Sequence, residues 1–270
     1  MNSKLIFFIL LLLSPNAMGF YEMRLTANDE GVTIHDKIVR LSLINNGDEK
    51  ANRLLLSIDT PAGIQTNIQK TPHLYPNKEF SGHFKLNVSS GLTNGTYSSP
   101  IHLDFLDGKG YPISMIFPFS INLGVQATGQ VNPIPSSFDI PEESSIPVRV
   151  EVVNYDDTER TVTVQAYAPN SMGLEGLPKG LTIPGRSKTN VSFYLINQQA
   201  LPGSTLNLLV SCEYLDSGIH YSRISTIKAH VIKKSMLDSV KKNPIIPTVL
   251  LMTAVILGLR FYQSRKPING

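Results

Sequence analysis

The stretch Val148-Arg149-Val150-Glu151-Val152-Val153-Asn154 decides the fold of this chain. Its valines alternate with charged residues at a period of two, which is the pattern of a β-strand with one buried face. A second stretch, Val39-Arg40-Leu41-Ser42-Leu43-Ile44-Asn45, shows the same alternation 109 positions earlier, so that residue 39 aligns with residue 148. The two stretches therefore predict equivalent strands in a duplicated all-β chain.

The match between the two parts of the chain continues beyond these strands. At the same offset, without a gap, further residues agree: Phe84 and Leu86 with Phe193 and Leu195, Leu92 with Leu201, and Phe105-Leu106-Asp107 with Tyr214-Leu215-Asp216. A repeat of about 100 residues has the size of one small β-sandwich domain.

Turn-forming residues separate the predicted strands at short intervals, as in Asn45-Asn46-Gly47-Asp48 and Asp107-Gly108-Lys109-Gly110. No helical period is visible between Phe20 and Val231. We therefore predict two tandem immunoglobulin-like β-sandwich domains, at residues 20–123 and 134–233, joined by a linker at 124–133. One larger barrel or jelly roll is the alternative.

The first 19 residues have the three regions of a secretory signal peptide. Lys4 precedes nine apolar residues, 5–13, and the small-residue site Ala17-Met18-Gly19 follows. Cleavage before Phe20 would leave the following residues outside the cytoplasm. An uncleaved anchor helix is the alternative, although this apolar run is shorter than the roughly 20 residues that a span needs.

A second hydrophobic segment lies near the other end, where no charged residue occurs from Asn243 to Leu259. It predicts a juxtamembrane segment at 234–243, a single-pass transmembrane helix at 244–262 and a short cytoplasmic tail at 263–270. Basic residues normally mark the cytoplasmic side of a span, but lysines also precede this segment, at 233, 234, 241 and 242. We therefore take the orientation of the helix from the predicted signal peptide. A cell-envelope sorting signal has a similar outline, but the Leu-Pro-x-Thr-Gly motif is absent.

Composition excludes several classes of function. The 24 basic and 21 acidic residues give a formal net charge of +3, which provides no reason to expect nucleic acid as a partner. Cys212 is the single cysteine, so it forms no internal disulfide, and its alternating position predicts burial. The six histidines lack metal-type spacing, and no nucleophile elbow or phosphate-binding loop is present. We therefore predict no catalytic, metal or cofactor site.

Three sequons begin at Asn87, Asn94 and Asn190, and they would accept glycans in a compartment that holds the enzymes. Asn87 and Asn190 alternate with apolar residues, which predicts that their side chains face solvent. Asp107 and Asp216 recur at equivalent turns. Because a calcium ion needs more oxygen ligands than these turns offer, we expect the two aspartates to cap turns instead.

Several short motifs resemble one known family. An apolar strand runs into Asn-x-Gly/Asp at residues 41–48, and turns of the Leu/Ile-x-Pro-Gly type precede strands at Ile183-Pro184-Gly185-Arg186 and Leu201-Pro202-Gly203-Ser204. These motifs resemble the CARDB-type immunoglobulin-like repeats of bacterial and archaeal envelope proteins. The resemblance covers both predicted domains and implies a sandwich fold outside the cytoplasm.

Together these observations predict a non-catalytic, membrane-anchored protein of the cell envelope or cell surface. Its tandem domains would bind another envelope or surface protein, or hold it at a set distance from the membrane, through exposed strand edges and end loops. Two alternatives remain open: a periplasmic chaperone-like protein that binds secreted clients through an edge strand, and an accessory subunit of an envelope enzyme complex.

Overall fold

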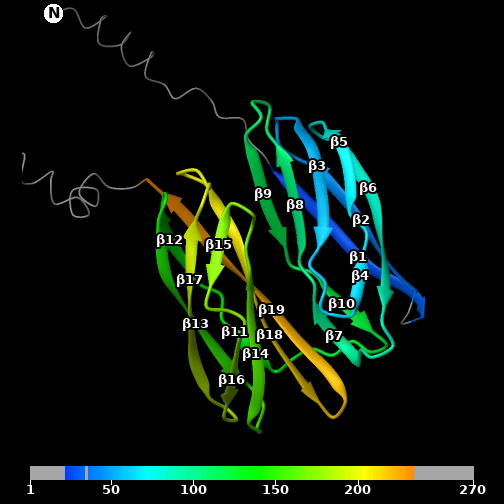
Figure 1. The fold of residues 1–270 in the computed structure, drawn as a ribbon, viewed down its shortest axis with the longest axis vertical. Helices are drawn as coiled ribbons and strands as arrows, with labels where there is room; N and C mark the ends of the chain where they lie inside the picture. Colours follow the sequence, from blue (N-terminus) through cyan, green and yellow to red (C-terminus); the bar gives the residue numbers. More distant parts are fainter. Residues whose placement is uncertain (1–21, 34–35, 234–270) are drawn as a thin grey trace, which may run out of the picture.

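The structure, a computed structural model, describes residues 22–33 and 36–233 (Figure 1). In this part of the chain every regular element is a β-strand, which confirms the all-β prediction. The predicted signal peptide, juxtamembrane segment, transmembrane helix and tail lie outside the described residues. Within 22–33 and 36–233, the structure contains no helix with the length and hydropathy of a membrane span.

The N-terminal half contains the strands β1 (Met23–Thr33), β2 (Asp36–Asn45), β3 (Ala51–Ile58), β4 (Ile64–Thr66), β5 (Gln69–Leu74), β6 (Glu79–Val88), β7 (Asn94–Ser98), β8 (Ile101–Leu106), β9 (Pro112–Phe117) and β10 (Ser120–Leu123). One sheet has the order β1-β2-β6-β4 and a second has the order β5-β3-β8-β9. The first hydrophobic core includes Leu43 and Phe84 from one sheet and Leu56 and Leu103 from the other.

The C-terminal half contains β11 (Val131–Pro133), β12 (Ser137–Pro141), β13 (Ser145–Asn154), β14 (Arg160–Tyr167), β15 (Met172–Glu175), β16 (Lys179–Ile183), β17 (Lys188–Asn197), β18 (Thr205–Asp216) and β19 (Ile219–Ile232). Its first sheet has the order β11-β13-β17-β15. In its second sheet β19, β18, β14 and β16 follow one another, and β12 pairs with β19. The second core lies between these sheets.

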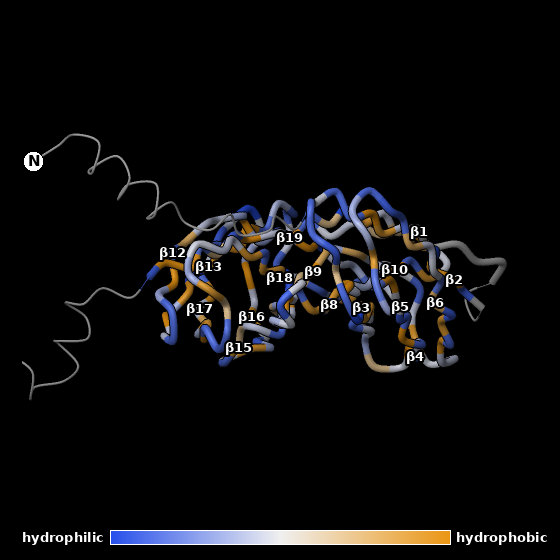
Figure 2. Tube along the Cα trace, turned by 90° about the horizontal axis from the view of Figure 1, so that it is seen from above, coloured by the Kyte–Doolittle hydropathy of each residue, from blue (hydrophilic) through white to orange (hydrophobic). Residues whose placement is uncertain are grey.

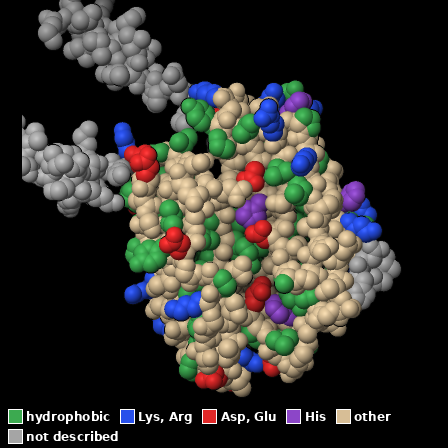
Figure 3. All heavy atoms as spheres, in the orientation of Figure 1, with side chains coloured by type: hydrophobic (Ala, Val, Ile, Leu, Met, Phe, Trp, Pro, Cys, Tyr) green, Lys and Arg blue, Asp and Glu red, His purple; other side chains and the backbone are tan. Residues whose placement is uncertain are grey.

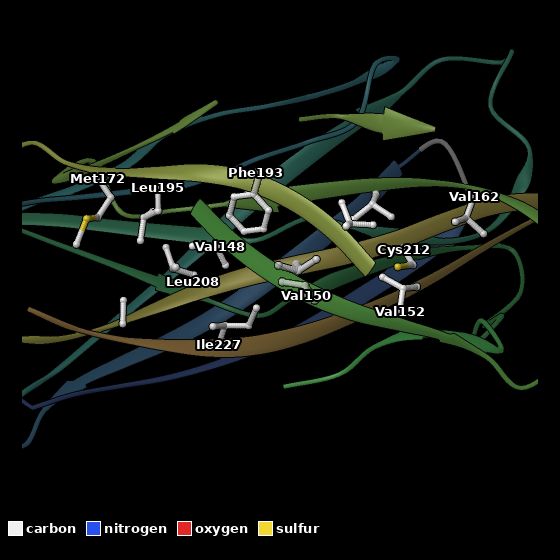
Figure 4. Packing of buried hydrophobic residues seen from close by; sticks show 14 of the residues in the cluster. Val148, Val150, Val152, Val162, Met172, Phe193, Leu195, Leu208, Cys212 and Ile227 are labelled. Atoms are coloured by element: carbon white, nitrogen blue, oxygen red, sulfur yellow. The ribbon is translucent and has the colours of Figure 1, made fainter. Parts of the chain in front are cut away.

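The alternation seen in the sequence sets the burial along β13. Val148, Val150 and Val152 are buried in the second core, on the same face of their sheet as Phe193 of the neighbouring strand β17 (Figure 4). Arg149 lies on the opposite, exposed face of the strand. Because successive side chains of a strand point to opposite faces, an apolar residue at every second position gives the strand one buried face and one solvent-exposed face.

Two buried asparagines fix equivalent turns in the two halves. The Asn45 side-chain amide donates to the main-chain oxygens of Glu49, at 2.8 Å, and Leu74, at 3.1 Å. Asn154 donates to the oxygens of Thr158, at 2.9 Å, and Ile183, at 3.1 Å. Each partner in the C-terminal half lies 109 residues after its counterpart. The Asn-x-Gly/Asp motif therefore marks one structural device that occurs twice.

The predicted linker is partly a strand. Residues 131–133 form β11, and Val131 pairs with Asn154 and is fully buried in the second core. Its valine follows the same burial rule as the longer strands, whereas the glycines and prolines around it indicated a loop. Figure 2 shows the two halves side by side, with hydrophobic residues inside each of them.

Candidate binding site at the junction of the two halves

The two halves share one continuous sheet, because β7 of the N-terminal half pairs with β19 of the C-terminal half. The pairing is parallel and sets Asn94 against Ile219 and Gly95 against His220. A Cβ atom on Gly95 would lie only 2.0 Å from the main-chain oxygen of His220. The close approach of the two strands therefore requires glycine at this position.

Polar side chains reinforce this joint. The Ser98 main-chain N–H donates to Glu213 Oε1 at 2.9 Å, and the Ser98 hydroxyl bonds that of Ser222. His220 Nδ1 donates to the Thr96 main-chain oxygen at 2.8 Å. The imidazole of His220 also stacks on the Tyr97 ring, with 4.0 Å between the centroids. Buried polar groups that satisfy one another in this way fix one relative position of the halves.

A smaller apolar contact lies beside the polar network. Ile116 of β9 and Leu209 of β18 are 1% and 0% exposed, although neither belongs to the hydrophobic core of its own half. Strands β9 and β18 are in contact, so these side chains are buried by the junction. The Asn170 N–H donates to Ser114 Oγ at 2.8 Å across the same interface.

The segment between the halves is held by both of them. The Ala127 N–H donates to Thr96 Oγ1 at 2.8 Å in the N-terminal half. The Gln130 N–H donates to the Tyr214 hydroxyl at 3.0 Å in the C-terminal half. The connection is therefore an ordered part of the joint. The two halves form one unit rather than two domains joined by a flexible linker.

A polar hollow opens at the junction, with a volume of about 620 Å³. We call it the acidic hollow; its ionisable lining residues are Asp59, His102, Tyr167 and Glu213. Burial, followed by the negative charge of Glu213 and then that of Asp59, raises the pKa of Tyr167 to about 12. Figure 3 shows acidic and histidine side chains along the middle of the face that it draws. Two carboxylates, those of Asp59 and Glu213, line the hollow.

The acidic hollow contains a hydrogen-bonded histidine and aspartate. His102 Nε2 lies 2.8 Å from Asp59 Oδ2, as a general base lies beside the carboxylate that orients it. Ser98 also lines the hollow, but its hydroxyl bonds Ser222. In the described part of the chain, no cluster of three or more His, Cys, Asp or Glu side chains could hold a metal ion. The Ser98–Ser222 bond joins the two halves, whereas the His102–Asp59 pair lies within the N-terminal half.

An apolar groove lies at another part of the junction. Residues 112–114 of β9 form one side, and residues 199–204 with Leu206 form the other. We call it the β9 groove; its volume is about 310 Å³. Leu201 on its rim is 52% exposed, and Tyr111 beside β9 is 58% exposed. Large exposed apolar side chains next to a groove are typical of surfaces that bind another molecule.

The residues singled out in the sequence lie apart from one another. Asn87, Asn94 and Asn190 are exposed on β6, β7 and β17. The predicted exposure of Asn87 and Asn190 is therefore confirmed, and whether any sequon carries a glycan stays a prediction. Cys212 is buried, as predicted.

The two equivalent aspartates have different roles. Asp107 caps its turn as predicted, because its Oδ1 accepts the N–H groups of Lys109, at 2.8 Å, and Tyr111, at 2.7 Å. Asp216 instead forms an ion pair with Arg160, with 2.9 Å between Oδ2 and Nη1.

Sequence reasoning missed the residues of the junction. Ser114 lies between Ile113 and Met115, and Ser98 and Ser222 each follow a tyrosine; small polar residues beside apolar ones in a strand normally face water. The signal that could have found them is their small size, since two sheets can approach closely only where outward side chains are small.

Comparisons with known proteins find matches among solved structures. No protein family model matches the chain, and no curated protein matches it. A protein of unknown function from Porphyromonas gingivalis W83 is similar at 12% identity over 77% of this chain and 99% of its own, with a TM-score of 0.33. The periplasmic chaperone SfaE is similar at 13% identity over 78% and 100%, with a TM-score of 0.29. Neither similarity carries an argument about function.

Proposed function

We propose that this chain is a non-catalytic, membrane-anchored protein of the cell envelope that binds another envelope protein. Its two halves would be tandem immunoglobulin-like domains, exported by the signal peptide and tethered by the C-terminal helix. The arrangement of two sheets around a separate core in each half supports the domain assignment.

The observation that carries the proposal is the joint between the halves. The parallel pairing of Gly95 with His220 and the buried contact of Ile116 and Leu209 make one body with a fixed geometry. A rigid pair of domains holds a binding surface in one orientation relative to its attachment point, as a scaffold or adaptor requires. An enzyme would instead need reactive groups converging on an open site.

One observation favours the chaperone-like alternative. The outer edge of β5, where Lys70 and His73 are exposed, has no partner strand among the described residues, and an open edge can accept a strand from an incompletely folded client. The two functions differ in the number of partners: an adaptor binds one or two proteins in fixed proportion, and a chaperone binds many.

Cross-linking in intact cells tests the proposal. The full chain would carry an affinity tag after Gly270, and the captured proteins would be identified by mass spectrometry. We expect one or two envelope proteins in fixed proportion to the chain, in the membrane fraction. Many incompletely folded secreted proteins at low occupancy would favour the chaperone-like function. Catalytic turnover by the purified full chain would contradict both.

A further inference from the structure

Each half of the molecule supplies one carboxylate to the acidic hollow. Asp59 directly follows β3 of the N-terminal half, and Glu213 belongs to β18 of the C-terminal half. Both act on one hydroxyl: burial, followed by the charge of Glu213 and then that of Asp59, raises the pKa of Tyr167 to about 12. The two carboxylates therefore lie near the same hydroxyl. No lysine or arginine is among the lining residues in the described part of the chain.

Each of these carboxylates has one oxygen that accepts a hydrogen bond and one that does not. Asp59 Oδ2 lies 2.8 Å from His102 Nε2, and Glu213 Oε1 accepts the Ser98 N–H at 2.9 Å. Within the described residues, Asp59 Oδ1 and Glu213 Oε2 accept no hydrogen bond. His220 Nε2 lies 3.8 Å from Glu213 Oε2, but the proton of the neutral ring is on Nδ1. Two carboxylate oxygens are therefore available to a ligand.

A buried serine supplies a third acceptor. Ser211 is 0% exposed, and its Oγ has no hydrogen-bond partner in the part of the chain that the structure describes. Its neighbours Val210 and Cys212 point into the second core, so Ser211 points to the opposite side of the sheet, as Glu213 does. Burial and Glu213 raise the pKa of Tyr167, and the Ser211 hydroxyl opposes them. This hydroxyl is therefore aimed at the hollow.

The unpartnered hydroxyl points to a ligand, because a buried polar group without a partner is costly and most such groups are paired. Gln165 pairs directly with Ser211 across the two strands, so their side chains lie on one face of the sheet. Gln165 and Tyr167 both line the hollow. A donor placed between them would satisfy Ser211 Oγ.

The polar atoms left without a partner determine the chemistry of the ligand. Two are carboxylate oxygens and the third is a buried hydroxyl, so the ligand must bring positive charge and several N–H donors. A guanidinium has five such donors and an ammonium has three, and neither accepts hydrogen bonds. Apolar residues that line the rest of the hollow would contact an aliphatic stem; they are Ile58, Pro61, Ala166, Ala168 and Leu174. The volume of about 620 Å³ lies within the usual range of ligand sites.

We propose that the acidic hollow binds an organic cation, a guanidinium or primary ammonium group on an aliphatic stem, through Asp59, Glu213 and Ser211. The cation belongs either to a basic side chain of another protein or to a small polyamine, since both present the same chemistry. This inference goes beyond the proposed function, which does not depend on what the hollow binds.

Calorimetric titration of the purified full chain in a neutral detergent tests the proposal. The cationic probes are N-acetylarginine methylamide and spermidine. The control ligand is N-acetylcitrulline methylamide, which has nearly the shape of the arginine derivative but no charge. We expect saturable binding of at least one cation, at least about tenfold tighter than that of the citrulline derivative. Tighter binding of the arginine derivative assigns the hollow to a basic side chain, and tighter binding of spermidine assigns it to a polyamine.

Two substitutions remove one charge each and keep the shape of the side chain. Asp59→Asn and Glu213→Gln should each weaken cation binding about tenfold, and Glu213→Gln keeps an acceptor for the junction. Asp139→Asn is the matched control, since Asp139 is exposed on β12. Asp139 pairs with His230, whereas Glu213 is opposite Ser222, roughly 26 Å away along β19. The control should weaken binding by less than about twofold.

Ser211→Ala separates a ligand contact from a structural role, because it keeps every charge of the hollow. The hydroxyl has no partner to lose in the fold, so the thermal midpoint without ligand should stay the same or rise. Affinity for the cation should fall at least about threefold. A lower midpoint with unchanged affinity would show that the hydroxyl supports the fold and contacts no ligand.

Three results would overturn the cation site. They are binding of the citrulline derivative as tight as that of the cations, equal losses in Asp139→Asn and Glu213→Gln, and no binding of either cation at about 10 mM. Circular dichroism would check that each variant is folded before titration. Capture of an envelope protein in intact cells is a separate measurement, so failure of the cation site leaves the proposed function intact.

Discussion

Replacing Asn154 by alanine should destabilise the C-terminal half strongly. The side chain is fully buried, and its amide donates to the main-chain oxygens of Thr158 and Ile183. Its Oδ1 accepts the Asp156 N–H at 3.0 Å. Three hydrogen bonds at about 1 kcal/mol each, with buried main-chain groups left unpaired, give a loss of about 3–4 kcal/mol. Typical domain stabilities are about 5–15 kcal/mol.

Equilibrium unfolding in urea would measure this loss. The chain contains no tryptophan. Unfolding of the full chain in detergent would therefore be followed by circular dichroism at the β-sheet band. With a slope of about 2 kcal/mol per molar urea, the midpoint should fall by about 1.5–2 M. Asn45→Ala should produce a similar shift in the N-terminal half, because Asn45 forms matching bonds.

Asn46→Ala is the control, since Asn46 is adjacent to Asn45 but exposed. Exposed substitutions of this kind usually change stability by less than about 0.5 kcal/mol. If Asn45→Ala and Asn154→Ala shift the midpoint no more than Asn46→Ala does, the asparagine motif does not stabilise the fold and the reasoning is wrong.

Three further predictions concern the junction, the thiol and acid stability. Gly95→Ala should separate β7 from β19, because its Cβ would lie 2.0 Å from the His220 oxygen; proteolysis within residues 124–130 should become faster while each half keeps its circular dichroism. Burial raises the pKa of Cys212 to about 12, so a thiol reagent at pH 8 should modify the chain only after unfolding, and rapid modification of the native chain would contradict its burial. The hydrogen bond from Arg160 lowers the pKa of Asp156 below 3.8. Its stabilisation is present above that pH and is lost as the pH falls through the lowered pKa, so Asp156→Asn should flatten the acid dependence of the thermal midpoint below about pH 4.

The local architecture could be predicted because its cause is local. Alternating residues such as Val148 and Val150 give a strand one apolar face wherever it lies in the molecule, and asparagine followed by glycine or aspartate closes a turn within a few residues. The all-β fold, the burial of Cys212 and the turn cap at Asp107 followed from these rules and are confirmed. The tandem domains stay a prediction, supported by the matching bonds of Asn45 and Asn154.

The candidate site could not be predicted, because it depends on contacts between distant residues. Ser98 and Ser222 are 124 positions apart in the chain, and nothing in the neighbourhood of either serine indicates the other. A small polar side chain in a strand is normally predicted to face solvent, but both serines are buried where β7 and β19 meet.

The sequence by itself determined the strand type, the turns and the targeting predictions, because periodicity and turn chemistry act over a few residues. Only the tertiary structure decided that β7 joins β19, that Ile116 and Leu209 are buried between the halves, and that an apolar groove forms between residues 112–114 and 199–204. The physical reason is that main-chain edges are chemically alike along the sequence, so which edge is paired depends on how whole sheets pack against each other.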